Sequence, residues 1–165
     1  MPHLAVTTLG NRNSGKSQTW NTLFGSTVKT GKYERRLYLN RAQYVNVFLV
    51  SGSPEEREEY VGEIITVEKP NIVLCSTQYI ESVRTTYDFF FANGYDVHVQ
   101  WLNPGFKDGT RYADSLDLVP YLLKKGATLE QSDGRADPKQ RAQNLVRVIL
   151  GWATFYDFVR TQFGE

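Results

Sequence analysis

The sequence predicts an α/β domain with a mostly parallel sheet, one antiparallel edge hairpin and helices on both faces. Segments with the composition of strands alternate with segments of helical periodicity, which is typical of βαβ units. Two strand-like segments, 36–39 and 44–50, are joined by so short a link that we expect an antiparallel hairpin. The continuous apolar segment 71–76 is typical of a central parallel strand.

The first half of the chain contains five predicted elements. A short apolar strand covers 3–9, and a helix covers 15–25 with Trp20, Leu23 and Phe24 at core-facing spacing. A polar, basic loop over 28–36 leads into the hairpin. Ser53 is then a typical helix N-cap, because Pro54 follows it at the first helical position and Glu56 completes a capping box. We expect that helix to continue to about residue 65.

The second half repeats the alternation of strands and helices. After the strand 71–76, a helix is predicted over 81–93 with Gly94 as its C-terminal cap, followed by a strand over 95–102. A loop over 103–115 and a short helix over 116–125, capped by Gly126, come next. Residues 131–136 are polar and are predicted to form a mobile segment. Asp137 and Pro138 then begin a last helix that is predicted to run to about Phe163.

The composition is that of an ordinary globular domain, with 165 residues and a net charge of +1. We expect one domain, residues 1–165, and a cytoplasmic location, because we find neither a signal-peptide pattern nor an apolar run long enough for a membrane. The single cysteine, Cys75, excludes an internal disulfide. Residues 1–45 carry seven lysines and arginines against one glutamate, which suits a triphosphate. The overall charge makes nucleic acid an unlikely partner.

The most informative motif lies between the first strand and the first helix. Residues 10–17 read G-N-R-N-S-G-K-S, which matches the phosphate-binding pattern G-x-x-x-x-G-K-S. In such a loop the backbone N–H groups surround the phosphates, the lysine reaches the β- and γ-phosphates, and the serine hydroxyl binds Mg²⁺. We therefore predict that ATP or GTP binds with Mg²⁺, that Lys16 is catalytic and that Ser17 is a metal ligand. The predicted binding residues are Asn11, Arg12, Asn13, Ser14, Gly15, Lys16, Ser17 and Gln18.

Other polar segments are expected at the same edge of the sheet. Ligands of open α/β sheets bind at the carboxyl ends of the strands. In this chain that edge would collect the phosphate loop with residues 51–53, 76–78 and 103–105.

The motif and the order of elements over about residues 3–103 resemble the Ras-like small GTPases within the P-loop NTPase superfamily. The resemblance implies the three-layer P-loop NTPase fold and a nucleotide-dependent molecular switch. It also implies that a protein partner binds the face formed by the loops 26–36 and 51–56.

The chain departs from that family where the family performs hydrolysis. Val50 falls on the aspartate that holds Mg²⁺ through water, and Pro54 falls on the glutamine that orients the attacking water. Ser53 replaces the glycine whose N–H meets the γ-phosphate. Glu55 or Glu56 could reach the metal from the helix start, although capping and the helix dipole explain them more simply.

The guanine-reading motif Asn-Lys-x-Asp is also absent. Asn103, Lys107 and Asp108 have the right chemistry at the wrong spacing, so the sequence does not choose between ATP and GTP. Several other residues have a possible role at phosphates or metal and a simpler role as loop or surface residues. These are Thr27, Thr30, Arg12, Arg35 and Arg36. His3, His98 and Cys75 are expected to be structural.

Three functions remain open from the sequence. The first is a slow Mg²⁺-dependent NTPase acting as a switch. The second is a P-loop kinase in which the segment 131–141, with Arg135, Lys139 and Arg141, closes as a lid and Asp133 or Asp137 acts as base. The third is an interaction module that binds nucleotide without hydrolysing it.

Overall fold

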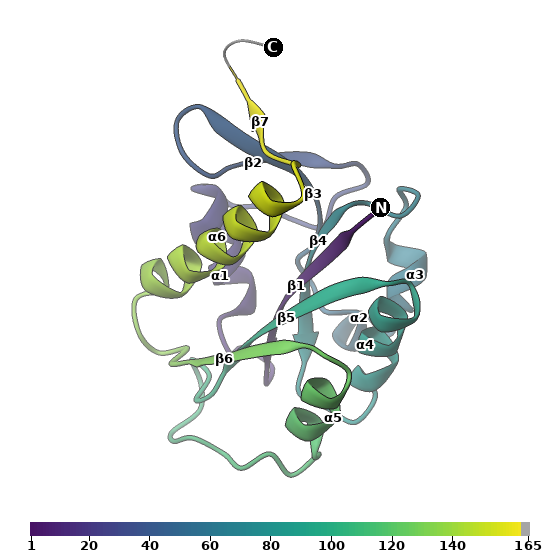
Figure 1. Ribbon diagram of the computed structural model, residues 1–165. Coiled ribbons are helices and arrows are strands. Elements are labelled where there is room, and N and C mark those ends of the chain that lie inside the picture. Colours follow the sequence, from purple (N-terminus) through teal and green to yellow (C-terminus); the bar gives the residue numbers. More distant parts are fainter. Residues whose placement is uncertain (163–165) are drawn as a thin grey trace.

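The computed structural model describes residues 1–162 and confirms an α/β fold built on a mostly parallel sheet. The strand order is β2-β3-β4-β1-β5-β6, and β7 pairs with β3 (Figure 1). The strands are β1 (His3–Gly10), β2 (Arg35–Tyr38), β3 (Gln43–Val50), β4 (Ile72–Gln78), β5 (Tyr95–Leu102), β6 (Thr128–Ser132) and β7 (Arg160–Thr161). The hairpin β2–β3 is antiparallel, as predicted, and β1 pairs in parallel with β4 and β5.

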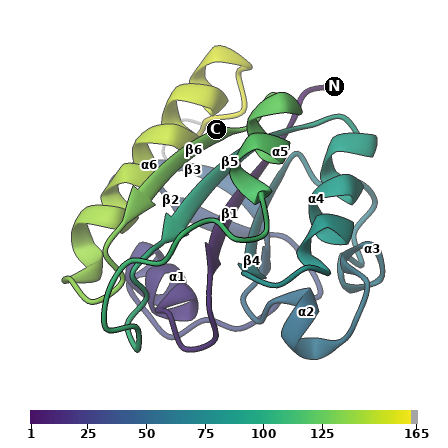
Figure 2. The ribbon, with the colours of Figure 1, turned by 90° about the horizontal axis from the view of Figure 1, so that it is seen from below.

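Helices cover both faces of the sheet, so that three layers enclose two cores. The helices are α1 (Lys16–Phe24), α2 (Pro54–Arg57), α3 (Val61–Ile64), α4 (Val83–Ala92), α5 (Leu118–Lys124) and α6 (Pro138–Phe155). Figure 2 shows α1 and α6 side by side on one face and α2 to α5 on the other. Trp20 of α1 and Leu145 of α6 share one buried cluster, whereas Val61, Tyr87 and Leu118 belong to the other.

The segment 53–65 is not one continuous helix, and that prediction was wrong. Glu58 has a positive φ of 54° and ends α2, and α3 begins three residues later. The physical reason lies in the charges, because a continuous helix would place Glu55 beside Glu58 and Glu59 at the i+3 and i+4 positions.

Two strands were not predicted. β6 is a polar edge strand whose backbone pairs with β5, so neither alternation nor an apolar run marks it. Residues 131 and 132 therefore belong to the sheet instead of a mobile segment. The last helix ends at Phe155, where Asp157 reverses the chain with a φ of 62° and β7 follows. The predicted end at Phe163 lies outside the described residues. None of the helices within residues 1–162 is long and apolar enough to cross a membrane.

Candidate functional site

The loop between β1 and α1 has the backbone of a compact anion-binding turn. Asn13 and Gly15 both have positive φ, 59° and 104°, and α1 begins directly afterwards at Lys16. Gly15 is required here, because an added Cβ would also lie 2.9 Å from the Arg141 guanidinium. The loop therefore presents successive N–H groups together with the positive end of a helix dipole, which favours an anion.

These groups line a small pocket of about 110 Å³ at the carboxyl ends of the strands. Within residues 1–162, the backbone N–H groups of residues 12–15 have no hydrogen-bond acceptor, and neither does the exposed hydroxyl of Ser17. The pocket is lined by Asn13, Ser14, Gly15, Lys16, Ser17, Ser51, Gly52, Ser53 and Glu56. Of the predicted binding residues, Arg12 is exposed at the loop, and Asn11 and Gln18 lie at its margins without lining the pocket.

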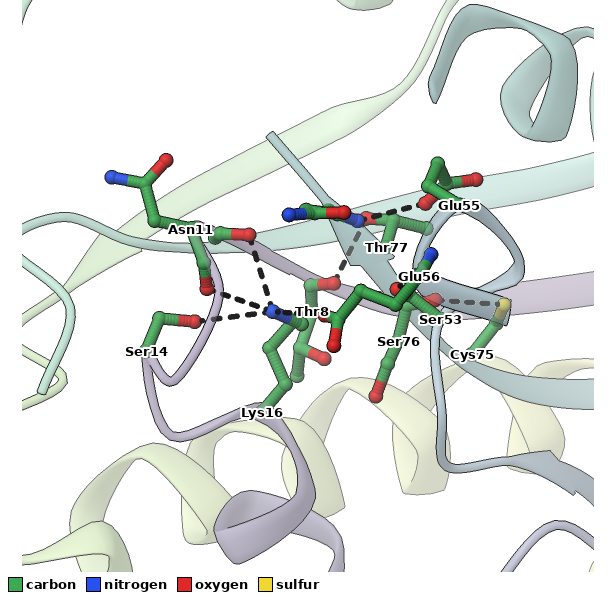
Figure 3. A network of polar contacts seen from close by, with 12 residues as sticks. Thr8, Asn11, Ser14, Lys16, Ser53, Glu55, Glu56, Cys75, Ser76 and Thr77 are labelled. Carbon is green, nitrogen blue, oxygen red and sulfur yellow. Dashed lines mark hydrogen bonds and ion pairs between the residues drawn. The ribbon is translucent and has the colours of Figure 1, made fainter. Parts of the chain in front are cut away.

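The Lys16 side chain folds back over the loop (Figure 3). Its ammonium group donates hydrogen bonds to the carbonyl oxygens of Asn11, at 2.8 Å, and Gly10, at 3.2 Å. It also lies 3.2 Å from a carboxylate oxygen of Glu56. The residue is only 6% exposed, and this burial lowers the pKa of Lys16, while Glu56 opposes that shift. Lys16 is therefore a cation held at the pocket by acceptors that a ligand can replace.

The short helix α2 carries two consecutive glutamates, Glu55 and Glu56, whose carboxylates have different partners (Figure 3). Ser53 caps the helix as predicted, with its hydroxyl accepting from the Glu56 N–H at 3.2 Å. Glu56 points into the pocket toward Lys16. Glu55 instead accepts from the Gln78 N–H at 2.8 Å and from the Thr86 hydroxyl, and burial raises the pKa of Glu55. From the sequence, either Glu55 or Glu56 could reach a bound metal. In the structure it is Glu56 that lies in the pocket beside Lys16.

The end of β3 carries no carboxylate. Val50 is fully buried in the core under α3 and α4 and does not line the pocket. Thr30 lies beside the next residues, where its hydroxyl accepts from the N–H groups of Ser51 at 3.0 Å and Gly52 at 3.4 Å. This contact joins the loop 26–36 to the pocket-lining segment 51–53.

The residues considered for base recognition have structural contacts. The Asn103 amide bonds to both the N–H and the carbonyl of Tyr112, at 2.9 Å and 2.8 Å. Asp108 accepts from the Gly105 N–H at 2.8 Å and from the Asn11 amide. The Lys107 ammonium lies over the Phe106 ring. These side chains thus shape the loop after β5 and do not converge on a base-reading group.

The remaining candidate cations do not gather at the phosphate loop. Arg35 donates to the Lys29 carbonyl, and Arg36 lies over the Tyr44 ring at 4.1 Å. Arg35 therefore contacts the loop that precedes β2, and Arg36 contacts β3. In the predicted lid, Arg135 pairs with Asp133 and donates to the Gly109 carbonyl, and neither Arg135 nor Asp133 lines the pocket. Asp137 caps α6, with its carboxylate accepting from the Lys139 N–H.

His3, His98 and Cys75 were expected to have structural roles, and all three are buried. His98 contacts Thr128 at 2.7 Å and Glu130 at 2.8 Å. Burial raises the pKa of the Cys75 thiol.

Arg141, which the sequence placed in a predicted lid, holds the phosphate loop from behind. Arg141 is 3% exposed and donates to Gly15, Gln18 and Thr19. Its position could have been inferred, because Arg141, Leu145, Ile149 and Ala153 repeat every four residues along the buried stripe of α6.

The pocket has the donor chemistry that Mg²⁺ prefers. Magnesium in triphosphate sites takes one or two protein oxygens and completes its shell with phosphate oxygens and water. The Ser17 hydroxyl and the Glu56 carboxylate are such oxygens, and both line the pocket. Within residues 1–162 no group of three His, Cys, Asp or Glu side chains could hold a metal ion without a ligand.

Searches against protein-family models and against curated proteins find no match for this chain.

Proposed function

We propose that this protein binds a nucleoside triphosphate, ATP or GTP, with Mg²⁺ at the pocket formed by the phosphate loop and the segment 51–56. One observation carries the proposal: a buried lysine, free loop N–H groups and an unengaged serine hydroxyl meet in one pocket at a helix N-terminus. This combination matches the charge and geometry of a chain of phosphates. The divergent P-loop NTPase interpretation rests on this site and its sequence motif.

Glu56 gives the pocket its capacity for hydrolysis. A γ-phosphate would compete with Glu56 for the Lys16 ammonium, which now lies 3.2 Å from both the carboxylate and the Gly10 carbonyl. The displaced carboxylate would then be available to accept a proton from an attacking water or to hold a metal-bound water. Bound Mg²⁺ would neutralise charge on the phosphates. We infer a slow Mg²⁺-dependent NTPase in which Glu56 takes the place of the missing aspartate and glutamine.

The Thr30 contact extends the proposal to a switch. Because Thr30 bonds to Ser51 and Gly52, a ligand that moves the segment 51–56 also disturbs the loop 26–36. These two segments form the proposed protein-binding face. The kinase alternative has less support, because Arg135 and Arg141 in the predicted lid are engaged in fixed contacts.

The test is a titration of the purified protein with ATP and with GTP, each with and without Mg²⁺, with released phosphate measured in the same samples. Lys16→Ala should weaken triphosphate binding by about a hundredfold or more, since it removes a charge-assisted contact. Lys124→Ala, at the distant end of α5, is the control and should bind like the parent.

Each outcome of this titration has a clear meaning. A parent protein that binds neither nucleotide, or a Lys16→Ala variant that binds as tightly as the parent, would exclude the proposal. Tight binding without phosphate release would identify the non-hydrolysing interaction module instead. Transfer of phosphate to an added acceptor would identify a kinase.

A further inference from the structure

Arg141 is a buried cation directly behind the phosphate loop. It comes from α6, which packs beside α1 on one face of the sheet (Figure 2). Its guanidinium donates to the Thr19 hydroxyl at 2.9 Å, the Ala136 carbonyl at 3.1 Å and the Gly15 carbonyl at 3.3 Å. The Gln18 side-chain oxygen lies 3.4 Å away. All four acceptors are neutral.

Within residues 1–162, no carboxylate lies close enough to Arg141 to form an ion pair. The two acidic residues that influence it electrostatically have other partners, since Asp133 pairs with Arg135 and Asp137 caps α6. Burial lowers the pKa of Arg141. A buried charge with only neutral partners is costly, so a protein that retains one gains a balancing charge elsewhere.

The Gly15 contact also fixes the direction of the loop. A trans peptide places its carbonyl oxygen and its N–H on opposite sides. By holding the Gly15 carbonyl from behind, Arg141 directs the N–H of Lys16 away from α6. The Thr19 contact secures the first turn of α1 in the same way. Both contacts hold the N-terminus of α1 so that its first N–H groups point away from α6.

The two cations near the loop have different surroundings. Lys16 is paired with Glu56 in the structure, so its charge is largely neutralised before any ligand binds. Arg141 has no such partner. The positive charge beneath the loop that is not held in an ion pair therefore comes from α6, 125 residues beyond the lysine of the motif.

We infer that Arg141 is a positioning residue of the phosphate site, which orients the loop and supplies a positive charge, not held in an ion pair, that attracts a polyphosphate anion. This inference rests on the proposed function. It does not require Arg141 to touch the ligand.

The test compares inorganic triphosphate with pyrophosphate, without Mg²⁺ so that each anion keeps its full charge. Arg141→Gln should weaken triphosphate binding by about tenfold or more. Because an electrostatic effect grows with ligand charge, the loss should be smaller for pyrophosphate. Arg141→Lys restores the charge without the planar fork and should recover the preference for triphosphate.

A second variant tests the charge while keeping the arginine. Gln18→Glu places a carboxylate beside the guanidinium, so it should preserve or raise the melting temperature while weakening triphosphate binding. Thr22→Glu is the matched control, because it adds the same charge one turn further along α1, where Thr22 has no contact with Arg141 among the described residues. It should weaken binding less than Gln18→Glu does.

The outcomes separate this inference from the proposed function. If the parent binds neither anion, the proposed function and this inference both fall. If the parent binds and Lys16→Ala does not, equal affinity of Arg141→Gln and the parent would overturn the inference alone. An equal loss for both anions would show that the arginine is merely structural. If Arg141→Gln does not fold, Gln18→Glu decides, and binding no weaker than that of Thr22→Glu would overturn the inference.

Discussion

The two sides of the phosphate loop differ in how their polar groups are used. On the β5–β6 side, the loop 103–108 bonds directly to it, since the Phe106 N–H donates to the Ser14 carbonyl at 3.0 Å. Gly134 packs against the same carbonyl, and its N–H donates to Pro104 at 2.7 Å. On the β3–β4 side, the segment 51–56 leaves a pocket in which Lys16 pairs with Glu56 and the Ser17 hydroxyl has no partner among residues 1–162.

The β5–β6 side therefore supports the loop, whereas the β3–β4 side has polar groups that can bind a ligand. Where donors and acceptors are satisfied by the protein, substitutions should reduce stability and affect binding only through the shape of the loop. Where bonding capacity is unused, substitutions should change binding and turnover with little effect on stability. The variants below test that division, from the largest expected effect to the smallest.

Gly134→Ala should disrupt the β5–β6 side most strongly. Its Cβ would lie 2.4 Å from the Ser14 carbonyl oxygen and 3.0 Å from the Gly105 Cα, and these backbone atoms cannot turn aside. We expect a loss of about 3 kcal/mol in urea unfolding, with weaker triphosphate binding because Ser14 shifts. Gly109→Ala is the control, because nothing lies within 4 Å of its added Cβ. Equal stability of the two variants would contradict the packing argument.

Asn103→Ala should reduce stability without changing the choice of base. The buried amide makes both of its hydrogen bonds to the Tyr112 backbone, and their removal should cost about 2 kcal/mol. The ratio of the affinities for ATP and GTP should stay as in the parent. Chemical unfolding and parallel nucleotide titrations measure both quantities. A selective loss of one nucleotide would show that Asn103 reads the base after all.

Glu56→Gln should change binding and turnover with little effect on stability, since Glu56 lines the pocket on the β3–β4 side. Without Mg²⁺, removal of the carboxylate that competes for Lys16 should tighten triphosphate binding by about tenfold. With Mg²⁺, phosphate release should fall to the uncatalysed rate. Calorimetric titration and a phosphate assay test the two effects. Glu59→Gln removes a nearby charge that pairs with Arg57 and should change neither.

Glu55→Gln should change mainly the pH dependence of stability. Because the pKa of Glu55 is raised in the folded state, the protonated carboxyl contributes stability below the ordinary glutamate pKa, and this contribution is lost as the pH rises through the folded value. As the pH rises from the ordinary glutamate pKa through the raised folded-state value, the parent should lose more unfolding free energy than Glu55→Gln. Urea unfolding at several pH values measures this difference, with substitution of the exposed glutamate of α3, Glu63→Gln, as the control. Parallel curves for the parent and Glu55→Gln would contradict the assignment.

The local sequence was sufficient for the elements with strong patterns. The apolar strand at 72–78, the capped start of α6 at Asp137 and the phosphate loop all depend on residues close in sequence. The capped start of α2 was predicted, but the break at Glu58, which has a φ of 54° and separates α2 from α3, was missed. The edge strand β6 was missed because its stability comes from pairing with β5.

The sequence by itself determined the ligand class proposed for this protein, because a phosphate loop is a local structure made by eight consecutive residues. Only the tertiary structure decided which distant side chains complete it. It places Glu56 in the pocket and its neighbour Glu55 against β4 and α4, and it brings Arg141 beneath a loop more than 120 residues away. The physical reason is that charge pairing and burial depend on distance in space, and the packing of α2 and α6 on opposite faces of the sheet sets those distances.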